Sequence, residues 1–557
     1  MRPQDYKLTH NTAHILFYAR NMSSLVESLV KTLTRTDGVS VTLNALALYG
    51  IYKLAKKAAS KLTLKNLMSA IPGAQAAVTA ELEKEVTKAV TDMFTPLVPE
   101  DQVMHKMPEK TGNFDTLLAQ MKEFGTKNAQ PDGKHFAYMY TTQRAEFSEF
   151  MNKVFALFAS ANALNPTAFP ALRKFEVDVT KMAANLFNCP SAVGTMTSGG
   201  TESIICAIKT YRDSAREKWS HITKPEVVIP VTGHVAFPKA GAILDVTFRF
   251  IQLKEDMTVD MKAYAAAIND NTILLVGSAP QYPHGIVDPI EAITALAASA
   301  VKGRTLPVHV DACIGGFVLP FVERLGYPVP LWDFRVPGVT SISADLHKYG
   351  YSAKGASTLL FRSRELRKFQ FWAFTRWPGG LFVSPSLLGT RGGGAIASAW
   401  AALVGLGIQG FTELTKITMD TRDSIIAHVA KNKHIQLLGT PHGSIVAFRS
   451  VNPQLNILSV ADHMGTKGWG MERQMHPDCI HMTLMPAHAA KWQQLVADLD
   501  ESVEHVLAHP ELAKTGSAAM YGMVAKIPSD TIVEDFLIEF ESQVFDADKY
   551  HAAAPPA

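Results

Sequence analysis

Between residue 135 and about residue 400, short apolar runs alternate with stretches of helical periodicity. The runs that we expect to form strands are residues 227–230, 272–280, 306–312, 339–344 and 357–363. Short apolar runs bounded by turns are typical of strands buried on both faces, and strands that alternate with helices are typical of a mainly parallel sheet. This region therefore predicts one large α/β domain with helices on both faces of its sheet.

The pattern changes on either side of this region. After about residue 411, helical segments alternate with a few strands, such as residues 442–450, which predicts a smaller α+β domain. Upstream, residues 76–94 have an amphipathic helical period. We expect five segments: an N-terminal extension (1–72), a helical segment (73–134), the large domain (135–410), the small domain (411–545) and a flexible tail (546–557).

Composition excludes several classes of protein. Of the 557 residues, 47% are hydrophobic and 19% are charged, so the chain can bury a large core and is not disordered over most of its length. Its 54 basic and 51 acidic residues nearly balance, so we do not expect nucleic acid to be the main partner. The four cysteines lie far apart without a CxxC pair. That spacing excludes a disulfide framework and a zinc module, suits a reducing compartment and leads us to expect no metal site.

An uncharged run of 15 residues, GVSVTLNALALYGIY, lies between Asp37 and Lys53. It is shorter than the ~20 apolar residues of a full bilayer span. Five lysines follow it, and by the positive-inside rule they would keep the rest of the chain on the cytosolic side. The run starts too far from Met1 for a cleavable signal peptide. It predicts either a short membrane anchor at about residues 38–55 or an amphipathic helix packed on the protein or on a membrane surface.

Lys348 and Asp311 are the first candidates for catalysis. Asp311 ends one predicted strand, and Lys348 follows another 37 residues later. Ligand sites of open α/β sheets gather at the carboxyl ends of strands. An aspartate there can keep a pyridine nitrogen protonated, and a lysine there can form a Schiff base with an aldehyde. A lysine alone is weak evidence, because most lysines are solvated surface charges.

Two upstream motifs fit the same chemistry. The segment TSGGTES (197–203) leads into a helical stretch, and free N–H groups at a helix start attract phosphate. His234 follows the strand at 227–230, where its ring could stack on a planar cofactor. Taken singly, the first could be an ordinary glycine-rich turn and the second a hydrogen-bonded structural histidine. Together with Asp311 and Lys348, in this order, they describe pyridoxal 5′-phosphate bound through a Schiff base.

Six segments carry a resemblance to a known family: TSGGTES, HVAFPKA, APQYPHG, HVDACIGGF, GVTSISADLHKYGYSAKG and LFVSPSLLGTRGG. With them, roughly residues 110–545 resemble the sphingosine-1-phosphate lyase family, fold-type-I pyridoxal-phosphate enzymes related to the group II amino-acid decarboxylases. The segment ADLHKYGYSAKG is particularly specific, because the decarboxylases share its His-Lys pair but not its second lysine. The resemblance implies an α/β fold of type I, with a mainly parallel sheet of seven strands in the large domain.

The resemblance implies a role for each matching residue. The catalytic residues would be Lys348, which forms the Schiff base, Asp311, which pairs with the pyridine nitrogen, and Tyr140. His234 would stack on the cofactor ring. The cofactor phosphate would be bound by Gly200, Thr201, His347 and, from the other subunit, Thr390. The substrate head group would be bound by Tyr140, Asn165, Tyr282 and Lys354. Lys354 is also attractive on physical grounds, because a phosphomonoester carries nearly two negative charges and needs a cation.

The chain departs from the family pattern at several of these positions. Asn165 replaces a histidine that contacts the substrate phosphate, and an asparagine can donate a hydrogen bond but cannot bear charge. Thr390 stands where serine is usual, a change that keeps the hydroxyl. Arg376 stands where an acidic residue is common and Gly392 where a proline is common. These changes concern substrate specificity more than cofactor chemistry.

The implied reaction is a retro-aldol cleavage of a phosphorylated sphingoid base to a long-chain aldehyde and phosphoethanolamine. The base that takes the proton of the C3 hydroxyl would be Tyr140 or the substrate phosphate. The family forms homodimers with shared active sites, and its eukaryotic members lie in the endoplasmic reticulum membrane with the catalytic part facing the cytosol; soluble members lack the anchor. Two alternatives remain, a decarboxylase of the same fold, with an arginine for the substrate carboxylate, and a membrane-associated scaffold without catalysis.

Overall fold

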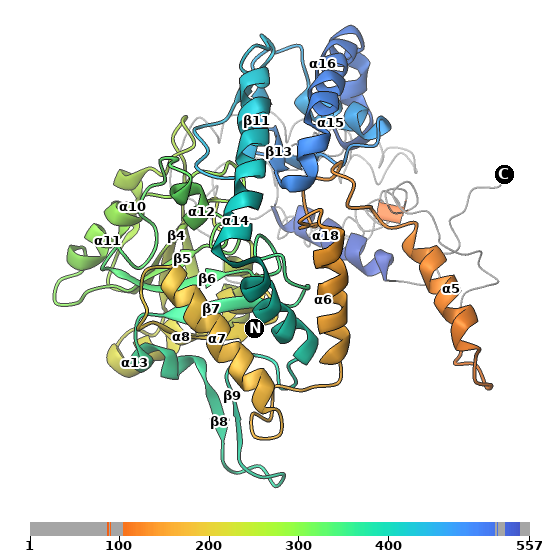
Figure 1. Ribbon diagram of the computed structural model, residues 1–557. Helices are drawn as coiled ribbons and strands as arrows, with labels where there is room; N and C mark the ends of the chain where they lie inside the picture. The colour runs from red at the N-terminus through yellow and green to blue at the C-terminus, as the bar shows by residue number, and fades with distance from the viewer. Residues whose placement is uncertain (1–85, 88–89, 91–103, 519–520, 522–529, 546–557) are drawn as a thin grey trace, which may run out of the picture. The chain divides into compact units, whose positions relative to one another are not determined.

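The computed structural model describes residues 86–87, 90, 104–518, 521 and 530–545 (Figure 1). The expected anchor at residues 38–55 and most of the amphipathic segment at 76–94 lie outside these residues. The chain divides into two units, Pro131–Ala518 and, separately, Met1–Gln130 with Ala519–Ala557. In the second unit, helix α5 (Phe114–Gly125) begins at an N-cap, where the Asn113 side chain accepts a hydrogen bond from the N–H of Thr116.

The larger unit is built on a sheet of seven strands in the order β1-β7-β6-β5-β4-β2-β3. The strands are β1 (Val193–Thr197), β2 (Glu226–Pro230), β3 (Thr247–Ile251), β4 (Thr272–Ser278), β5 (Val308–Asp311), β6 (Val339–Ala344) and β7 (Ser357–Phe361). Every pairing from β6 to β3 is parallel, whereas β7 is antiparallel to both of its neighbours. The predicted mainly parallel seven-stranded sheet is therefore confirmed, with strand ends that differ from the expected ones by a few residues.

Two hydrophobic cores lie on the two faces of this sheet. Along β2, Val228 belongs to one core, whereas Val227 and Ile229 belong to the other. This alternation follows from the two-residue period of a strand. Strands β2, β4, β5 and β7 are buried along their whole length, as expected for strands covered on both faces. The helices that cover the faces are α7 (Pro170–Leu186), α8 (Gly200–Lys218), α9 (Ala236–Leu244), α10 (Met261–Ala267), α11 (Ile290–Ser299) and α12 (Leu319–Arg324).

Helix α14 (Gly393–Val429) runs from the sheet region into the C-terminal region, so it spans residue 410, the expected boundary between the large and small domains. It bends at Gly407, whose φ of 57° lies outside the helical region and is one that glycine adopts readily. Beyond it, an antiparallel sheet has the order β10-β11-β13-β12. These strands are β10 (Ile435–Leu437), β11 (Ile445–Ser450), β12 (Glu472–Gln474) and β13 (Cys479–Thr483). Helices α15 (Ile457–Thr466) and α16 (Trp492–Ala508) pack together beside it.

Among the described residues, α14 is the one helix long and apolar enough to cross a membrane. More than half of its most apolar window is buried inside the protein, and Ile396, Ala399 and Ala402 belong to hydrophobic cores. The apolar character of α14 is therefore explained by packing. A hairpin of β8 (Trp372–Phe374) and β9 (Phe382–Ser384) projects from the same unit, below the main sheet in Figure 1.

Candidate active site

A cavity of about 460 Å³ lies at the carboxyl ends of the central strands. It brings together residues from distant parts of the chain, and the predicted site residues among them are Tyr140, His234, Tyr282, Asp311, His347, Lys348 and Lys354. Asp311 is the last residue of β5, and Lys348 follows shortly after the end of β6. These two strands are parallel neighbours, so their carboxyl ends meet at one edge of the sheet.

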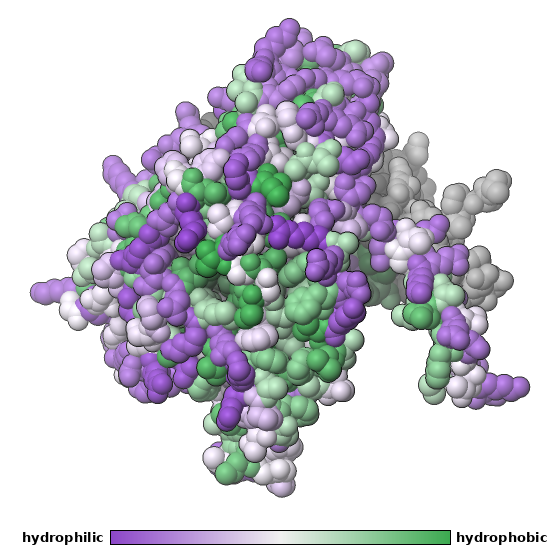
Figure 2. All heavy atoms as spheres, in the orientation of Figure 1, coloured by the Kyte–Doolittle hydropathy of each residue, from purple (hydrophilic) through white to green (hydrophobic). Residues whose placement is uncertain are grey.

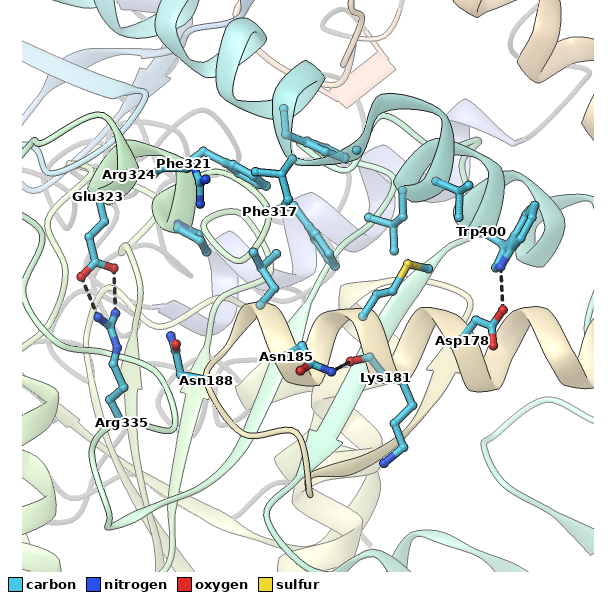
Figure 3. Close-up of a pocket in the computed structure, with 18 residues that line it drawn as sticks. Asp178, Lys181, Asn185, Asn188, Phe317, Phe321, Glu323, Arg324, Arg335 and Trp400 are labelled. Atoms are coloured by element: carbon cyan, nitrogen blue, oxygen red, sulfur yellow. Dashed lines mark hydrogen bonds and ion pairs between the residues drawn. The ribbon is translucent and has the colours of Figure 1, made fainter.

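A second and larger cavity, of about 980 Å³, lies between α7, α12 and α14 (Figure 3). Its carboxylates already have partners in the protein. Asp178 accepts a hydrogen bond of 2.9 Å from Trp400, and Glu323 forms an ion pair of 2.6 Å with Arg335 (Figure 3). The cavity is lined by helices instead of strand ends, so the smaller cavity is the candidate active site.

The Asp311 carboxylate is fixed at the bottom of the smaller cavity. Its Oδ1 accepts hydrogen bonds from the Cys313 N–H (3.0 Å) and the Ser343 hydroxyl (3.2 Å). Burial alone would raise the pKa of Asp311, but the nearby His234 and the hydrogen bonds from Cys313 outweigh this effect and hold the pKa below its usual value. Asp311 is therefore ionised at neutral pH and can pair with a protonated ring nitrogen.

The start of α8 does not line the cavity but packs against two residues beside it, Cys313 and Asp345. The helix begins at Gly200, and among the described residues no side chain caps it. A Cβ atom at Gly200 would lie 2.7 Å from Asp345 Oδ2 and 2.9 Å from Cys313 Sγ, so only glycine fits. The free N–H groups of a helix start bind phosphate, which is consistent with the predicted roles of Gly200 and Thr201.

His347 can donate a hydrogen bond on the same side of the cavity. Its Nδ1 accepts a hydrogen bond from the Ala356 N–H at 3.3 Å, which leaves the proton of the neutral ring on Nε2. Burial lowers the pKa of His347, although Asp345 opposes this shift, so the ring is neutral at physiological pH. A neutral ring with a proton on Nε2 suits the predicted contact to a phosphate.

The predicted head-group residues Tyr140, Tyr282 and Lys354 lie around the mouth of the cavity. Lys354 Nζ is 4.8 Å from the centre of the Tyr140 ring and donates a hydrogen bond of 2.7 Å to the Tyr138 carbonyl. Burial raises the pKa of Tyr140 to about 12, so this phenol keeps its proton at neutral pH. Burial likewise raises the pKa of Tyr282, whose ring lies 4.4 Å from that of His481.

Thr390 and Asn165 do not line the cavity in this chain. Both are exposed, and they lie on two segments that are bonded to each other. Asn162 donates a hydrogen bond of 3.3 Å to the Thr390 hydroxyl, and the Ala163 N–H donates one of 2.9 Å to the carbonyl of Arg391. The segment that carries Thr390 is therefore bonded to the segment that carries Asn165.

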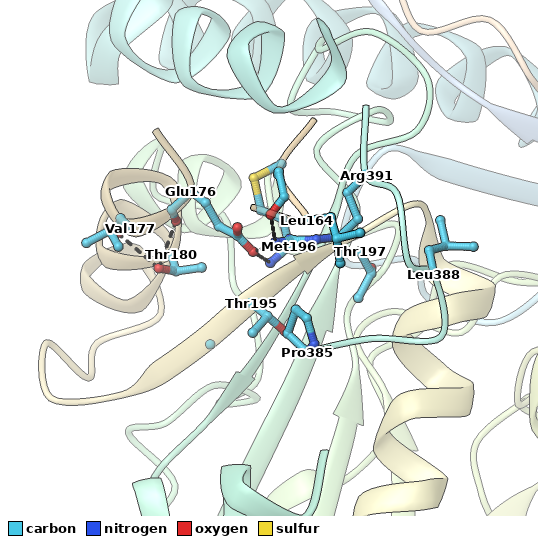
Figure 4. Close-up of polar contacts among 12 residues, drawn as sticks. Leu164, Glu176, Val177, Thr180, Thr195, Met196, Thr197, Pro385, Leu388 and Arg391 are labelled. Carbon is cyan, nitrogen blue, oxygen red and sulfur yellow. Dashed lines mark hydrogen bonds and ion pairs between the residues drawn. The ribbon is translucent and has the colours of Figure 1, made fainter. Parts of the chain in front are cut away.

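A partly buried ion pair links the segment that carries Thr390 to the sheet (Figure 4). Arg391 Nη1 lies 2.7 Å from Glu176 Oε1 of α7, and the same oxygen accepts a hydrogen bond of 2.9 Å from the Met196 N–H of β1. Charge-assisted hydrogen bonds of this kind are stronger than neutral ones. They give the segment before α14 a defined position relative to the strands.

The sequence did not reveal the role of Glu202, which lies within TSGGTES. Its buried side chain accepts hydrogen bonds from the Ser198 N–H (2.6 Å) on one oxygen and from the Leu387 and Leu388 N–H groups (2.9 and 3.2 Å) on the other. Glu202 thus ties the glycine-rich loop to the segment that leads to Thr390. The contact joins positions 185 residues apart, so local sequence carries no signal for it.

Comparison with known proteins agrees with this geometry. Residues 99–451 match the pyridoxal-dependent decarboxylase conserved domain. A sphingosine-1-phosphate lyase of Dictyostelium discoideum is 37% identical over 475 residues, which cover 84% of this chain and 87% of that protein. The structure of a sphingosine-1-phosphate lyase of Burkholderia pseudomallei has 33% identity and a TM-score of 0.70, covering 77% of this chain and 98% of the other. A Lactobacillus brevis glutamate decarboxylase shares the fold, with 19% identity, a TM-score of 0.63 and coverage of 73% and 96%.

The fold and the cavity define a pyridoxal-phosphate-dependent enzyme of fold type I. Within that class, the chain belongs to the sphingosine-1-phosphate lyase family. Pyridoxal 5′-phosphate is its cofactor, and the residues present fit this group. They supply an amine at Lys348, an ionised carboxylate at Asp311 and, at Gly200, a helix start that only glycine can form.

The position of Glu202 leads to a testable prediction. In Glu202→Gln, the side chain keeps its size but loses one acceptor oxygen, so one of its two sets of backbone N–H groups loses a partner. A lost hydrogen bond to a charged group costs about 1.5–3 kcal/mol. We expect the Kd of pyridoxal phosphate, measured from its absorbance, to rise roughly ten- to hundredfold.

Glu217→Gln is the matched control, because Glu217 is an exposed residue of the same helix that pairs with Lys368 at 3.2 Å. This variant should bind the cofactor like the wild type. An unchanged Kd in Glu202→Gln would contradict the role assigned to Glu202.

Proposed function

We propose that this chain cleaves phosphorylated sphingoid bases into a long-chain aldehyde and phosphoethanolamine. The observation that carries the proposal is one cavity in which Lys348 and Asp311 lie together with the cation of Lys354 and the phenol of Tyr140. The first pair serves cofactor chemistry, and the second pair provides a place for a phosphorylated head group. Membership in the sphingosine-1-phosphate lyase family supports the same reaction.

The cofactor supplies an aldehyde that bonds the substrate amine and a ring that takes up the electron pair released when the C2–C3 bond breaks. Asp311 contributes by staying ionised and holding a proton on the ring nitrogen. His234, held by a hydrogen bond of 3.1 Å from the Ala236 N–H to Nδ1, supports the ring from one side. Lys348 would hold the cofactor through its amine.

Two proton transfers involve named groups. The C3 hydroxyl must lose a proton as the bond breaks, and a Tyr140 pKa of about 12 makes this phenol a poor base at neutral pH. This favours the substrate phosphate as the base and gives Tyr140 the role of a hydrogen-bond donor. C2 must then gain a proton, and the Lys348 amine is the donor that we assign.

We propose that the active unit is a homodimer whose subunits share their sites. Thr390 and Asn165 are exposed, lie on two segments that are bonded to each other and do not line the cavity of their own chain, as expected for residues that serve a partner's site. The β8–β9 hairpin, which precedes Thr390, exposes Trp377, Leu381 and Val383. Apolar residues gather in this part of the face seen in Figure 2. An exposed apolar hairpin next to these residues is suited to contact a second copy.

We further propose that the protein acts at the endoplasmic reticulum membrane with its catalytic part in the cytosol. The support is the uncharged run before Lys53 and the lysines that follow it. The substrate, a lipid with a long alkyl chain, fits this location. A protein without the anchor would act as a soluble cytoplasmic enzyme.

The two alternative functions have less support. A decarboxylase should hold its substrate carboxylate with an arginine, and no arginine is among the described residues that line the cavity. Lys354 and Tyr140 stand there instead. A scaffold without catalysis would not need Lys348 and Asp311 at the ends of adjacent strands.

The reaction can be tested directly with Lys348→Ala. Wild-type protein should release equal amounts of aldehyde and phosphoethanolamine from a phosphorylated sphingoid base. The variant lacks the amine that bonds the cofactor, so we expect a loss of activity of at least about a thousandfold. Release of carbon dioxide from an amino acid, with no aldehyde, would support the decarboxylase instead.

Asn165 gives a second test, because Asn165→His restores the residue usual in the family. An imidazole is charged below a pH of about 6.5, whereas the amide is neutral at every pH. We therefore expect the KM for the substrate to fall severalfold at pH 6 and to stay near the wild-type value at pH 8.5, with little change in kcat. Asn165→Gln, which adds no charge, is the control. A ratio of the Asn165→His KM to the wild-type KM that is the same at both pH values would place this residue away from the substrate phosphate.

A further inference from the structure

Asp345 is a buried carboxylate that the sequence did not single out. It is the first residue after β6, and its side chain is 2% exposed. Its Oδ2 lies 3.0 Å from Lys348 Nζ and 3.6 Å from His347 Nε2. Among the described residues, Asp345 is the ion-pair partner of the lysine that holds the cofactor.

The backbone holds this carboxylate in a fixed place. The Asp345 N–H donates a hydrogen bond of 3.2 Å to the Cys313 carbonyl, which follows β5. Gly200 packs against the carboxylate from the start of α8, where a Cβ atom would lie 2.7 Å from Oδ2. The other oxygen, Oδ1, is buried and finds no hydrogen-bond partner in the described part of the chain. Burying a carboxylate while one of its oxygens has no hydrogen bond costs free energy of folding. A functional contact with Lys348 would explain why this carboxylate is present.

We propose that Asp345 is a positioning residue for the reaction: its carboxylate holds the Lys348 amine beside the substrate and keeps it protonated, so that the amine can deliver a proton to C2. The inference rests on the proposed lyase function. Asp345 keeps Lys348 protonated after the substrate has displaced the lysine from the cofactor.

The proton balance closes with this role. The substrate amine enters with three N–H protons and keeps one of them in its Schiff base. The other two go to Lys348 Nζ, which had one proton in its own Schiff base and becomes an ammonium group with three. One Nζ–H bond then breaks as the C2–H bond forms, which leaves a neutral amine. That neutral amine displaces the product, and the proton removed from the C3 hydroxyl goes to the departing phosphoethanolamine. Asp345 does not take part in this proton balance.

The surroundings of Lys348 favour this assignment. Burial alone lowers the pKa of Lys348, but the charge and hydrogen bond of Asp345, together with smaller effects of Cys313 and Tyr140, raise the pKa above the usual value. Burial raises the pKa of both Cys313 and Tyr140, so neither is a competing anion at neutral pH. The ionisable groups that face Lys348 in the cavity are Asp345, Asp311, Cys313, Tyr140, Tyr282, His234, His347 and Lys354.

The test compares Asp345→Asn with the wild type as full-length, cofactor-loaded enzymes. The absorbance of the bound cofactor reports the protonation of Lys348 Nζ in its Schiff base, and it can be followed from pH 6 to pH 10. We expect the midpoint of this titration to fall by at least about one pH unit in Asp345→Asn, because the neutral amide no longer favours the proton. We also expect kcat to fall at least tenfold while KM changes less than about twofold.

Asp333→Asn is the matched control, because Asp333 is a buried carboxylate outside the cavity that pairs with Arg335 at 2.9 Å. This variant should lose stability without any change in the titration. Asp345→Glu, which keeps the charge, should have a midpoint between those of the wild type and Asp345→Asn. Superimposable titrations of the wild type and Asp345→Asn would overturn the proposal and leave Asp345 a purely structural residue.

A second measurement serves if Asp345→Asn binds the cofactor too weakly for the absorbance titration. In cofactor-free full-length protein at pH 8, acetic anhydride should acylate Lys348 roughly tenfold faster in Asp345→Asn than in the wild type, since the neutral fraction of the amine rises with each unit by which its pKa falls. Equal acylation rates would overturn the proposal. This readout does not depend on the reaction: a wild type that releases no aldehyde would refute the lyase function alone, and equal acylation rates would refute the role of Asp345 alone.

Discussion

The adjacent carboxyl ends of β5 and β6 are the constraint on which the rest of the site depends. One strand ends in Asp311, and the other leads directly into Asp345 and, three residues later, Lys348. Two buried carboxylates so close to each other would be costly if they shared one environment. They do not, because Asp311 accepts hydrogen bonds from Cys313 and Ser343 whereas Asp345 faces the lysine amine. Different partners allow the first to serve the cofactor ring and the second the amine.

The packing of the sheet makes this arrangement rigid. Because strands such as β2 place alternate side chains in two separate cores, the strand ends are held from both faces. Loops that carry functional residues are then tied back to the strands by buried polar contacts. Glu202 joins the glycine-rich loop to the segment before Thr390, and Glu176 joins Arg391 to β1. Glu202 uses both of its carboxylate oxygens for backbone N–H groups, whereas Glu176 uses one oxygen for a backbone N–H and a guanidinium.

The sequence predicted the parts of the molecule that depend on local pattern and on order along the chain. Short apolar runs gave β2, β4, β5, β6 and β7 of the main sheet but not β1 and β3. The positions of Asp311 and Lys348 gave the cavity, because strand ends in a parallel sheet converge. The predicted strand ends were less accurate. Strand β4 stops at Ser278 instead of residue 280, because Pro280 has no N–H for a hydrogen bond in the sheet. Strand β11 starts at Ile445 instead of residue 442. Glu202 and Asp345 were missed because their partners lie far along the chain or depend on side-chain direction. The roles of Thr390 and Asn165 stay predictions, since a second subunit would complete them.

The charge of Lys354 depends on the groups around it. Asn165 carries no charge, so in this chain Lys354 is the side chain in the cavity mouth that can match a phosphate charge for charge. Burial and the neighbouring Lys348 both lower the pKa of Lys354. The Lys354 amine therefore loses its proton at a lower pH than an ordinary lysine, and attraction for the phosphate weakens as pH rises through that value. In the proposed homodimer, where Asn165 would serve the site of a second copy, a neutral residue at this position adds no cation that would lower the pKa of Lys354 further. Under the proposed function, Lys354 therefore carries the charge that recognises the head group.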